Sequence, residues 1–389
     1  MNQHIDFTRK SIIDPLLLEP SLDLDALRDE IIQNYTNFQK SIDSNDKKYI
    51  RELHIYSKLR NDLRALSEAN QEFKKLRKYF ISPEMLQIEK IQPVLLNVDD
   101  STLYQRLFKL VRHTWSMPHS KGYGRRLRFL VWDQYHESVI GIIGMQSPPA
   151  DLKCRDRLYT YPTDQKMHLV NQTLDVYTLG SIPPYSNLLG GKLVAGLVAS
   201  SFVQETFHKK YFGKYSEMDH NLISHRLVGA TTTSAFGKSS IYNRLAFQKR
   251  LLAKPIGYTL GYGTIHLEPT FPKMIELLKS KGNYHNGGYG SGPKPKWQNA
   301  VRALQHLGIS QKYLRHGLSR EVFLFEFCEG FEAGMNGDDF GETHQFTVKE
   351  FSDFWLERWA KPRASRFPEW RNIDIEQYFN EALMSCKSP

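Results

Sequence analysis

Residues suited to binding a phosphate stand at one turn near the middle of the chain. Residues 179–200, LGSIPPYSNLLGGKLVAGLVAS, run from a strand-like segment through two prolines and two glycines into apolar residues at helical spacing. The start of a helix offers free backbone amides and a positive dipole end to an anion. The turn therefore predicts a site for a phosphate-bearing cofactor, and a glycine turn for close helix packing is the alternative. The residues of the predicted site are Asn187, Gly190, Gly191 and Lys192.

A second motif that suggests phosphate is GKSS at residues 237–240. A P-loop has the pattern GxxxxGK[ST], and Thr232 stands where its first glycine belongs. We therefore expect no nucleotide hydrolysis at this motif. Lys238 would meet a phosphate as a point charge, whereas Ser239 or Ser240 would serve the next helix as an ordinary N-cap.

Arginines beside aromatic rings form two groups, HSKGYGRRLRF at residues 119–129 and KPRASRFPEWR at residues 361–371. Guanidinium groups bind backbone phosphates, and aromatic rings stack on unpaired bases. The two groups together predict binding of DNA or RNA, while a solvated surface would explain either group alone. With Lys238, the predicted contacts to nucleic acid are Lys121, Arg125, Arg126, Arg128, Lys361, Arg363 and Arg366.

Catalytic chemistry has little support in the sequence. The polar loop at residues 332–344, EAGMNGDDFGETH, contains four carboxylates and a histidine, which are ligands for a hard metal ion, so a metal-dependent nuclease is one alternative. A solvated loop explains the same residues, and no metal ligand is assigned. No nucleophile and base stand out as a pair. The catalytic residues, the identity of any cofactor and the question of whether the chain is an enzyme therefore stay open.

Helical spacing dominates the N-terminal residues. The apolar side chains recur at intervals of three, four or seven until Ser82-Pro83 ends the pattern. The residues of this apolar face are Leu63, Leu66, Phe73, Leu76 and Phe80. Short β-rich segments follow from about residue 113, with helices expected after Lys192 and after GKSS. The predicted strands cover residues 126–133, 138–147, 174–182, 225–235 and 257–267.

Strands that alternate with helices in this way predict an α/β or α+β class with a mixed sheet. The order of elements resembles the fold of GCN5-related acyltransferases, whose pyrophosphate turn reads Q/R-x-x-G-x-G/A. Asn187, Gly190 and Lys192 stand at the equivalent positions here, without the basic first residue and the small last residue. The resemblance implies an acyltransferase-like core and, as an alternative function, an acyltransferase-like enzyme that uses the glycine turn.

The same patterns divide the chain into four predicted parts. An N-terminal helical region covers residues 1–112, the acyltransferase-like α/β core covers 113–279, and a basic linker or loop rich in Gly and Pro covers 280–296. The remainder, residues 297–389, is a mixed, helix-rich and basic C-terminal extension. It holds helix-like residues 297–309 and 347–359 around a strand-like segment, REVFLFEF.

Composition favours a cytoplasmic protein with an anionic partner. The 389 residues carry a formal net charge of +10 and only three cysteines, which argues against a disulfide framework or a structural zinc site. No stretch is long and apolar enough for a membrane span. Asp6, Asp14 and Glu19 interrupt the residues where a secretory signal would stand.

Four long motifs follow one another within residues 112–366, namely GRRLRFLVWD, LGSIPPYSNLLGGKLVAGLVAS, TTTSAFGKSSIYNRL and GYTLGYGTIH. Together they resemble the DruA family of the Druantia antiphage systems. The resemblance implies a component of a bacterial multigene defence system against phage that works beside a helicase-like protein. It supplies no catalytic residues. The sequence therefore predicts a defence component that binds nucleic acid and other proteins of the system.

Overall fold

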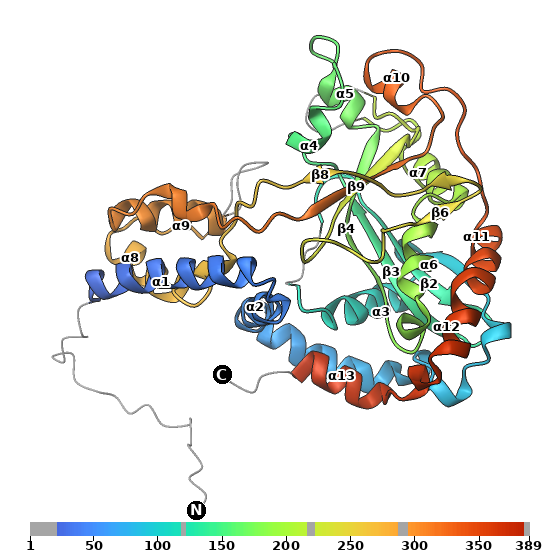
Figure 1. The fold of residues 1–389 in the computed structure, drawn as a ribbon, viewed down its shortest axis with the longest axis horizontal. Helices are drawn as coiled ribbons and strands as arrows, with labels where there is room; N and C mark the ends of the chain where they lie inside the picture. The colour runs from blue at the N-terminus through green and yellow to red at the C-terminus, as the bar shows by residue number, and fades with distance from the viewer. Residues whose placement is uncertain (1–21, 118–121, 216–221, 287–294, 385–389) are drawn as a thin grey trace, which may run out of the picture. The chain divides into compact units, whose positions relative to one another are not determined.

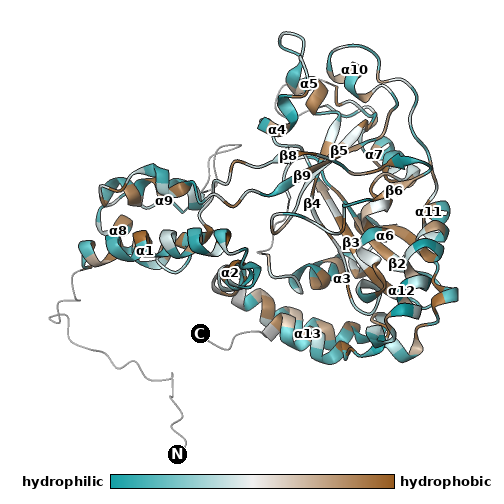
Figure 2. Cartoon of the chain, viewed as in Figure 1, coloured by the Kyte–Doolittle hydropathy of each residue, from teal (hydrophilic) through white to brown (hydrophobic). Residues whose placement is uncertain are grey.

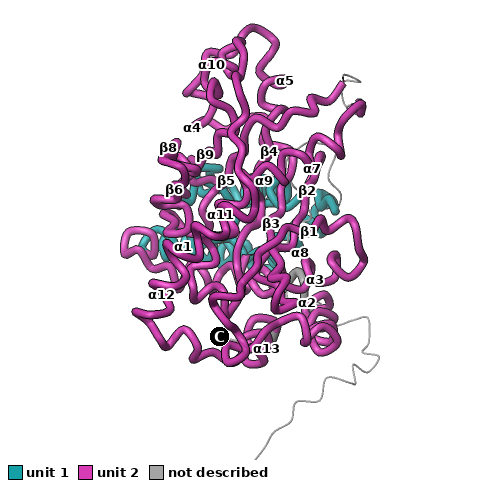
Figure 3. The backbone as a smooth tube through the Cα atoms, turned by 90° about the vertical axis from the view of Figure 1, so that its right-hand side faces the viewer, with its two compact units in different colours: residues 1–40, 263–316 teal, residues 41–262, 317–389 magenta. Residues whose placement is uncertain are grey.

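The structure is a computed structural model that describes residues 22–117, 122–215, 222–286 and 295–384, without the side chains of residues 60–63 and 384. Backbone contacts group the chain into two units, neither of which is a continuous stretch (Figure 3). Unit 1 comprises residues 1–40 and 263–316, and unit 2 comprises residues 41–262 and 317–389. The four-part division with boundaries at residues 112, 279 and 296 stays a prediction.

Unit 2 contains a seven-stranded mixed sheet in the order β1-β2-β3-β4-β5-β9-β8. Neighbouring strands are antiparallel except for β4 and β5, which are parallel. The sheet confirms the predicted mixed α/β class. Its strands are β1 (Pro93–Asn97), β2 (Leu127–Asp133), β3 (Ser138–Gln146), β4 (Thr173–Ser181), β5 (Gly229–Thr233), β8 (Lys254–Tyr258) and β9 (Glu321–Glu326).

Helices cover both faces of this sheet (Figure 1). Side chains alternate along β2, so that Phe129 and Val131 enter one core and Leu130 enters the other, as the period of a strand requires. The first core is closed by α6 (Gly190–Leu197), α7 (Ser201–Tyr211) and α11 (Val348–Trp355). The second is closed by α2 (Lys47–Leu76), α3 (Thr102–His113) and α13 (Ile375–Met384).

The two parallel strands, β4 and β5, are paired over only part of β4. β4 pairs with β5 only from Thr173 to Val176, and β4 then continues to Ser181 beside β3 alone. Tyr177 is an extra residue in β4, because Met145 pairs with Val176 and the preceding Gly144 pairs with Thr178. The chain then enters α6 and α7 before it returns to β5. The carboxyl ends of parallel strands followed by helices are where open α/β sheets bind ligands.

Unit 1 is built from helices α1 (Leu24–Asp43, whose last residues belong to unit 2), α8 (Phe271–Ser280) and α9 (Pro295–His306). Figure 2 shows hydrophobic and hydrophilic residues alternating along α1 and α9, as expected of helices with one buried side. Leu27 and Ile31 of α1 share one core with residues of α8 and α9. Lys273 Nζ and Glu30 Oε2 add an ion pair at 2.6 Å on its surface.

Two predicted elements differ from the structure. The helix expected after GKSS was wrong, because residues 236–251 form turns and the short hairpin of β6 (Ala246–Phe247) and β7 (Arg250–Leu251). The backbone of Arg244 has a φ of 55°, which a right-handed helix does not allow. The predicted strand at 257–267 forms only where it overlaps β8.

Other predicted segments match the structure more closely. The long N-terminal helix is α2, and the N-terminal residues also contain strand β1, which was not predicted. Of the predicted linker, residues 287–294 lie outside the described residues, between the end of α8 and the start of α9. Within the described part of the chain, no helix has an apolar stretch that could cross a membrane.

Candidate functional site

The glycine turn connects the carboxyl end of β4 to α6. Leu189 has a left-handed backbone with a φ of 62°, and α6 begins at the next residue. A Cβ on Gly190 would lie 2.6 Å from the carbonyl oxygen of Tyr185, which is backbone and cannot move aside cheaply. A Cβ on Gly191 would meet only the side chain of Ile241, at 3.3 Å. Close packing therefore requires the first glycine and tolerates a small residue at the second.

The turn is tied to the C-terminal part of unit 2. Trp355 Nε1 donates to the carbonyl oxygen of Leu189 at 3.1 Å, and Asn187 Nδ2 donates to that of Trp370 at 3.0 Å. Arg363 Nε donates to the carbonyl oxygen of Asn187 at 3.4 Å. The Asn187 amide, predicted to meet a cofactor, thus links the glycine turn to the segment that contains Trp370.

Lys192 points from α6 to the segment that follows GKSS. Its Nζ donates to three carbonyl oxygens, at 3.1 Å to Ser240, 3.2 Å to Ile241 and 2.8 Å to Asn243. Burial lowers the pKa of this ammonium. Three carbonyls satisfy its three donors, so the lysine fixes the backbone of residues 240–243.

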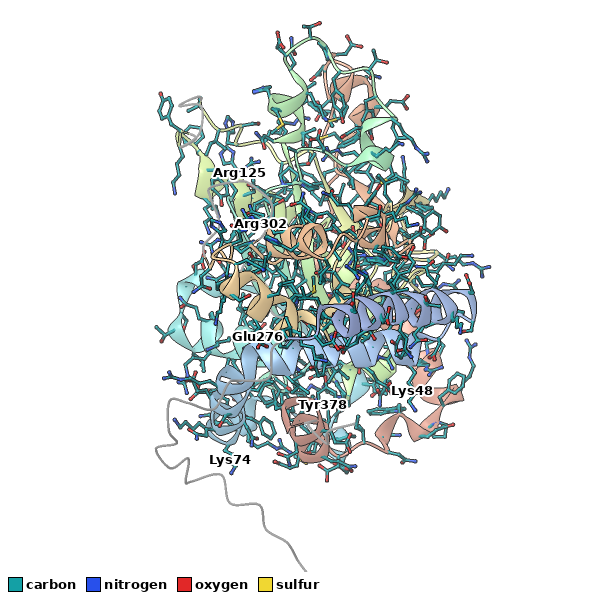
Figure 4. The ribbon with its side chains drawn as sticks, turned by 90° about the vertical axis from the view of Figure 1, so that its left-hand side faces the viewer. Lys48, Lys74, Arg125, Glu276, Arg302 and Tyr378 are labelled. Atoms are coloured by element: carbon teal, nitrogen blue, oxygen red, sulfur yellow. The ribbon has the colours of Figure 1, made fainter. Side chains whose placement is uncertain are left out.

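The first arginine group lies at the start of β2 and is largely engaged within the fold. The Arg125 guanidinium, labelled in Figure 4, donates to the backbone and side-chain oxygens of Asn171 and lies 5.9 Å from the ring centre of Phe207. Burial lowers the pKa of Arg125. Arg128 pairs with Asp99 at 2.7 Å. Arg126 follows Arg125 directly, and Lys121 lies outside the described residues.

The second arginine group lies on α12 (Lys361–Arg366), at the other end of the sheet. Helix α12 contacts the turn that follows the last residue of β4. The first group lies on both sides of Leu127, which pairs with Met145 of β3, and Met145 in turn pairs with Val176 in the first half of β4. Arg363 stacks 3.7 Å from the ring centre of Phe367, Lys361 pairs with Glu357, and Arg366 is exposed. The structure does not bring the two groups together.

Lys238 lies in a pocket with aromatic residues, which we call the Lys238 pocket. The volume of this pocket is about 460 Å³. Two of its lysines, Lys47 at the start of α2 and Lys238, are exposed. The Arg51 guanidinium lies 5.6 Å from the ring centre of Phe236 in its wall. No carboxylate is among the described residues that line it: Ile42, Asn45, Lys47, Ile50, Phe236, Gly237, Lys238, Tyr258, Gly317, Leu318 and Ser319.

An aspartate that was not predicted lies inside the sheet, on β4. Gln146 Nε2 donates to Asp175 Oδ2 at 3.0 Å, and Thr231 Oγ1 donates to Oδ1 at 3.3 Å. Burial outweighs these hydrogen bonds and the charges of Arg155 and Arg320, and it raises the pKa of Asp175 to about 6. A carboxyl group that titrates near neutral pH can accept a proton as a general base.

One sequence signal would have pointed to Asp175. It is a carboxylate in a strand whose neighbours Leu174 and Val176 are apolar, and aspartate is rare among buried residues unless it is paired. The carboxylates and the histidine of residues 332–344 were considered as metal ligands, but none of them was assigned. Across the described residues, no three His, Cys, Asp or Glu side chains come together as a metal site.

Comparison with known proteins agrees with the motifs. The family model for the Druantia protein DruA matches residues 44–337. A Druantia protein DruA from Escherichia coli (strain UMEA 4076-1) is 35% identical over 339 residues, which cover 84% of this chain and 82% of that protein. No solved structure matches the chain significantly. The extent of both matches confirms the resemblance, and the chain belongs to the DruA family of Druantia proteins.

Proposed function

We propose that this chain is a component of a Druantia antiphage system that binds single-stranded nucleic acid at the Lys238 pocket. Family membership supports the defence role. The binding rests on one observation, the Lys238 pocket itself, in which two exposed lysines stand with two aromatic rings. Partner proteins of the system, one of them helicase-like, would supply or receive the strand.

The chemistry of the Lys238 pocket suits an unpaired strand. Within the described part of the chain, neither Lys47 nor Lys238 has a carboxylate partner, so both charges are available to phosphates. Lysines that neutralise phosphates release counterions and give affinity without sequence preference. The Tyr258 ring is 46% exposed and offers a flat face on which any base can stack.

The proposal extends to some of the predicted arginine contacts. Arg366 on α12 is exposed and carries its charge at the surface. Arg125 is left out, because its guanidinium is half-buried and hydrogen-bonded to Asn171. Lys238 thus has the leading role among the predicted contacts.

Fluorescence anisotropy with a labelled oligothymidylate tests this proposal. Tyr258→Ala should weaken binding about tenfold, the usual effect of losing one stacked base, whereas Tyr258→Phe should retain affinity because the ring stays. Lys74→Ala/Lys75→Ala removes two charges near the far end of α2 and should match the wild type. Equal affinities for Tyr258→Ala and the wild type would contradict base stacking at this pocket.

A second candidate function is group transfer by an acyltransferase-like core. Two features favour it: the divergence of β4 from β5 after Val176, ahead of the turn into α6, and the proton-accepting Asp175 on β4. Tyr123 stands near this carboxylate, since burial and then the Asp175 charge raise the pKa of its phenol. Thiol release from acetyl-CoA by the wild type, and its loss in Asp175→Asn, would support the enzyme. Release that persists in the variant would exclude Asp175 as the base.

A further inference from the structure

A second pocket, which we call the hairpin pocket, lies between α6, the β6–β7 hairpin and the end of α11. Its volume of about 560 Å³ is within the range of small-molecule and cofactor sites. It lies beside the glycine turn and shares no lining residue with the Lys238 pocket. The residues that line it are Lys192, Ser240, Asn243, Arg244, Ala246, Phe247, Gln248, Lys249, Phe354, Arg358 and Trp359.

The charged side chains that line the hairpin pocket are all positive. Lys192 lies at its inner wall, and the side chains of Arg244, Lys249 and Arg358 are exposed around it. No aspartate or glutamate occurs among the described residues that line it, and no ion pair engages these last three cations in the described part of the chain. Several cations around one concave space attract an anion.

The backbone of this pocket adopts conformations that its side chains disfavour. Gln248 and Lys249 form the two-residue turn between Phe247 and Arg250, with φ of 48° and 62°. Such a turn normally carries Asn-Gly, because side chains with a Cβ resist positive φ at both positions. Arg244, with a φ of 55°, is a third such residue in the same wall. Residues with disfavoured φ values cluster at functional sites, so three of them in one wall indicate a role for their side chains.

An irregular helix forms the opposite wall. The π-helical turn η8 (Leu356–Ala360) continues α11 and presents both Arg358 and Trp359 to the pocket. Such turns occur frequently at functional sites. The Trp359 ring lies 5.2 Å from that of Phe354, and the Lys192 ammonium lies 5.5 Å from the Trp359 ring centre. This wall offers a flat aromatic surface next to positive charge.

Both walls are held in place before a ligand arrives. Phe247 of the hairpin packs against the rings of Phe346, Phe351 and Phe354, with ring centres 5.0 to 5.3 Å apart. The three hydrogen bonds from Lys192 fix the backbone that leads to the hairpin. A preformed site loses little conformational entropy when it binds.

We propose that the hairpin pocket binds a nucleoside phosphate. The phosphates lie against Lys249, Arg244 and Arg358, and the base lies on Trp359. A free nucleotide is the occupant to which we commit, because four cations and the Trp359 ring line one pocket whose volume of about 560 Å³ suits a small ligand. The site is separate from the nucleic-acid contact proposed above.

Titration of the full chain with N-methylanthraniloyl-ADP, a fluorescent nucleotide, tests the proposal. The wild type should bind saturably, pyrophosphate should compete because it carries the recognised charge, and adenosine should compete poorly. An excess of oligothymidylate should not displace the probe. Arg358→Ala should weaken binding by about tenfold or more, the usual effect of losing a charged hydrogen bond. Lys74→Ala/Lys75→Ala, with the charge removed elsewhere, should bind as the wild type does.

Gln248→Asn/Lys249→Gly separates a binding role from a structural one. The new turn has the residues that its backbone prefers, so the melting temperature should hold or rise while nucleotide affinity falls about tenfold with the loss of the Lys249 charge. Absence of saturable binding by the wild type, or equal affinity in this variant, would overturn the proposal. Displacement of the probe by the oligothymidylate would also overturn it, since the site would then belong to a strand.

Discussion

Two basic pockets adjoin the same segment, residues 236–249, and they are built differently. The Lys238 pocket has lysines on an open surface beside an exposed tyrosine. The hairpin pocket has cations on a strained turn and a π-helical turn, fixed by buried aromatic rings. Point charges beside a stacking ring suit a polymer of any sequence, whereas several cations on a preformed backbone around one pocket suit one small ligand.

A third charged region, around Asp175, sharpens this comparison because its side chain is half-buried in the sheet and accepts hydrogen bonds from Gln146 and Thr231. The pKa of Asp175 is about 6 in the folded chain and 3.8 in the absence of the fold. The folded state therefore binds the proton more tightly, and the wild type loses stability as the pH rises from about 4 to 6. Above pH 6 the whole of this cost is present.

Asp175→Asn should therefore give the largest change in stability. At pH 8 it should raise the free energy of unfolding by about 3 kcal/mol, since a shift of one pKa unit is worth about 1.4 kcal/mol. The gain should shrink as the pH falls through 6 and vanish below about 4. Urea unfolding at pH 8, 6 and 4 measures it, and an equal gain at all three values would show that ionisation is not the cause.

Lys192→Met should disturb both pockets, because the lysine holds the backbone between them. The loss of three hydrogen bonds from a charged donor to carbonyl oxygens should lower the free energy of unfolding by about 2 kcal/mol. Affinity for the nucleotide and for the strand should both fall. If only nucleotide binding changes, the Lys238 pocket does not depend on the backbone that Lys192 holds.

Gln248→Asn/Lys249→Gly should alter the hairpin pocket alone. Removing two disfavoured left-handed residues should stabilise the fold by about 1 kcal/mol. Thermal unfolding measures the change, and Gln248→Asn alone should give part of it. A fall in melting temperature would mean that the Gln-Lys pair stabilises the turn through contacts of its own.

The smallest expected effect is that of Lys238→Ala on ATP hydrolysis, because the isolated chain should not hydrolyse ATP at all. Thr232, where a P-loop needs glycine, is buried in β5 and bonds to the carbonyl oxygen of Val176 at 3.1 Å. The loop that ends in Lys238 therefore cannot wrap its amides around a triphosphate. Phosphate release that disappears in Lys238→Ala would contradict this.

The sequence predicted the elements whose periodicity is local. The β-rich composition of residues 126–133 and the apolar face of α2 identified a strand and a helix that the structure contains. The hairpin after GKSS was missed because Gln248-Lys249 lacks the Asn-Gly signature of its turn.

The sites were harder to predict than the elements, because they depend on contacts between distant residues. Asp175 meets Gln146 and Thr231 only through the register of three strands. The engagement of Arg125 with Asn171 is equally non-local, so the arginine looked like a surface residue in the sequence. Lys238, predicted as a nucleic-acid contact, lies in one basic pocket, and Lys192, predicted to meet a cofactor, lines the other.

The salt dependence of strand binding tests the central claim most directly. Anisotropy of a labelled oligothymidylate, measured from low to high salt, should give a plot of log affinity against log salt that is shallower in Lys47→Ala/Lys238→Ala than in the wild type. Two lost phosphate contacts should reduce the slope by about 1.4, at about 0.7 per contact for a single strand. Identical slopes and affinities, or no binding by the wild type at low salt, would contradict the account.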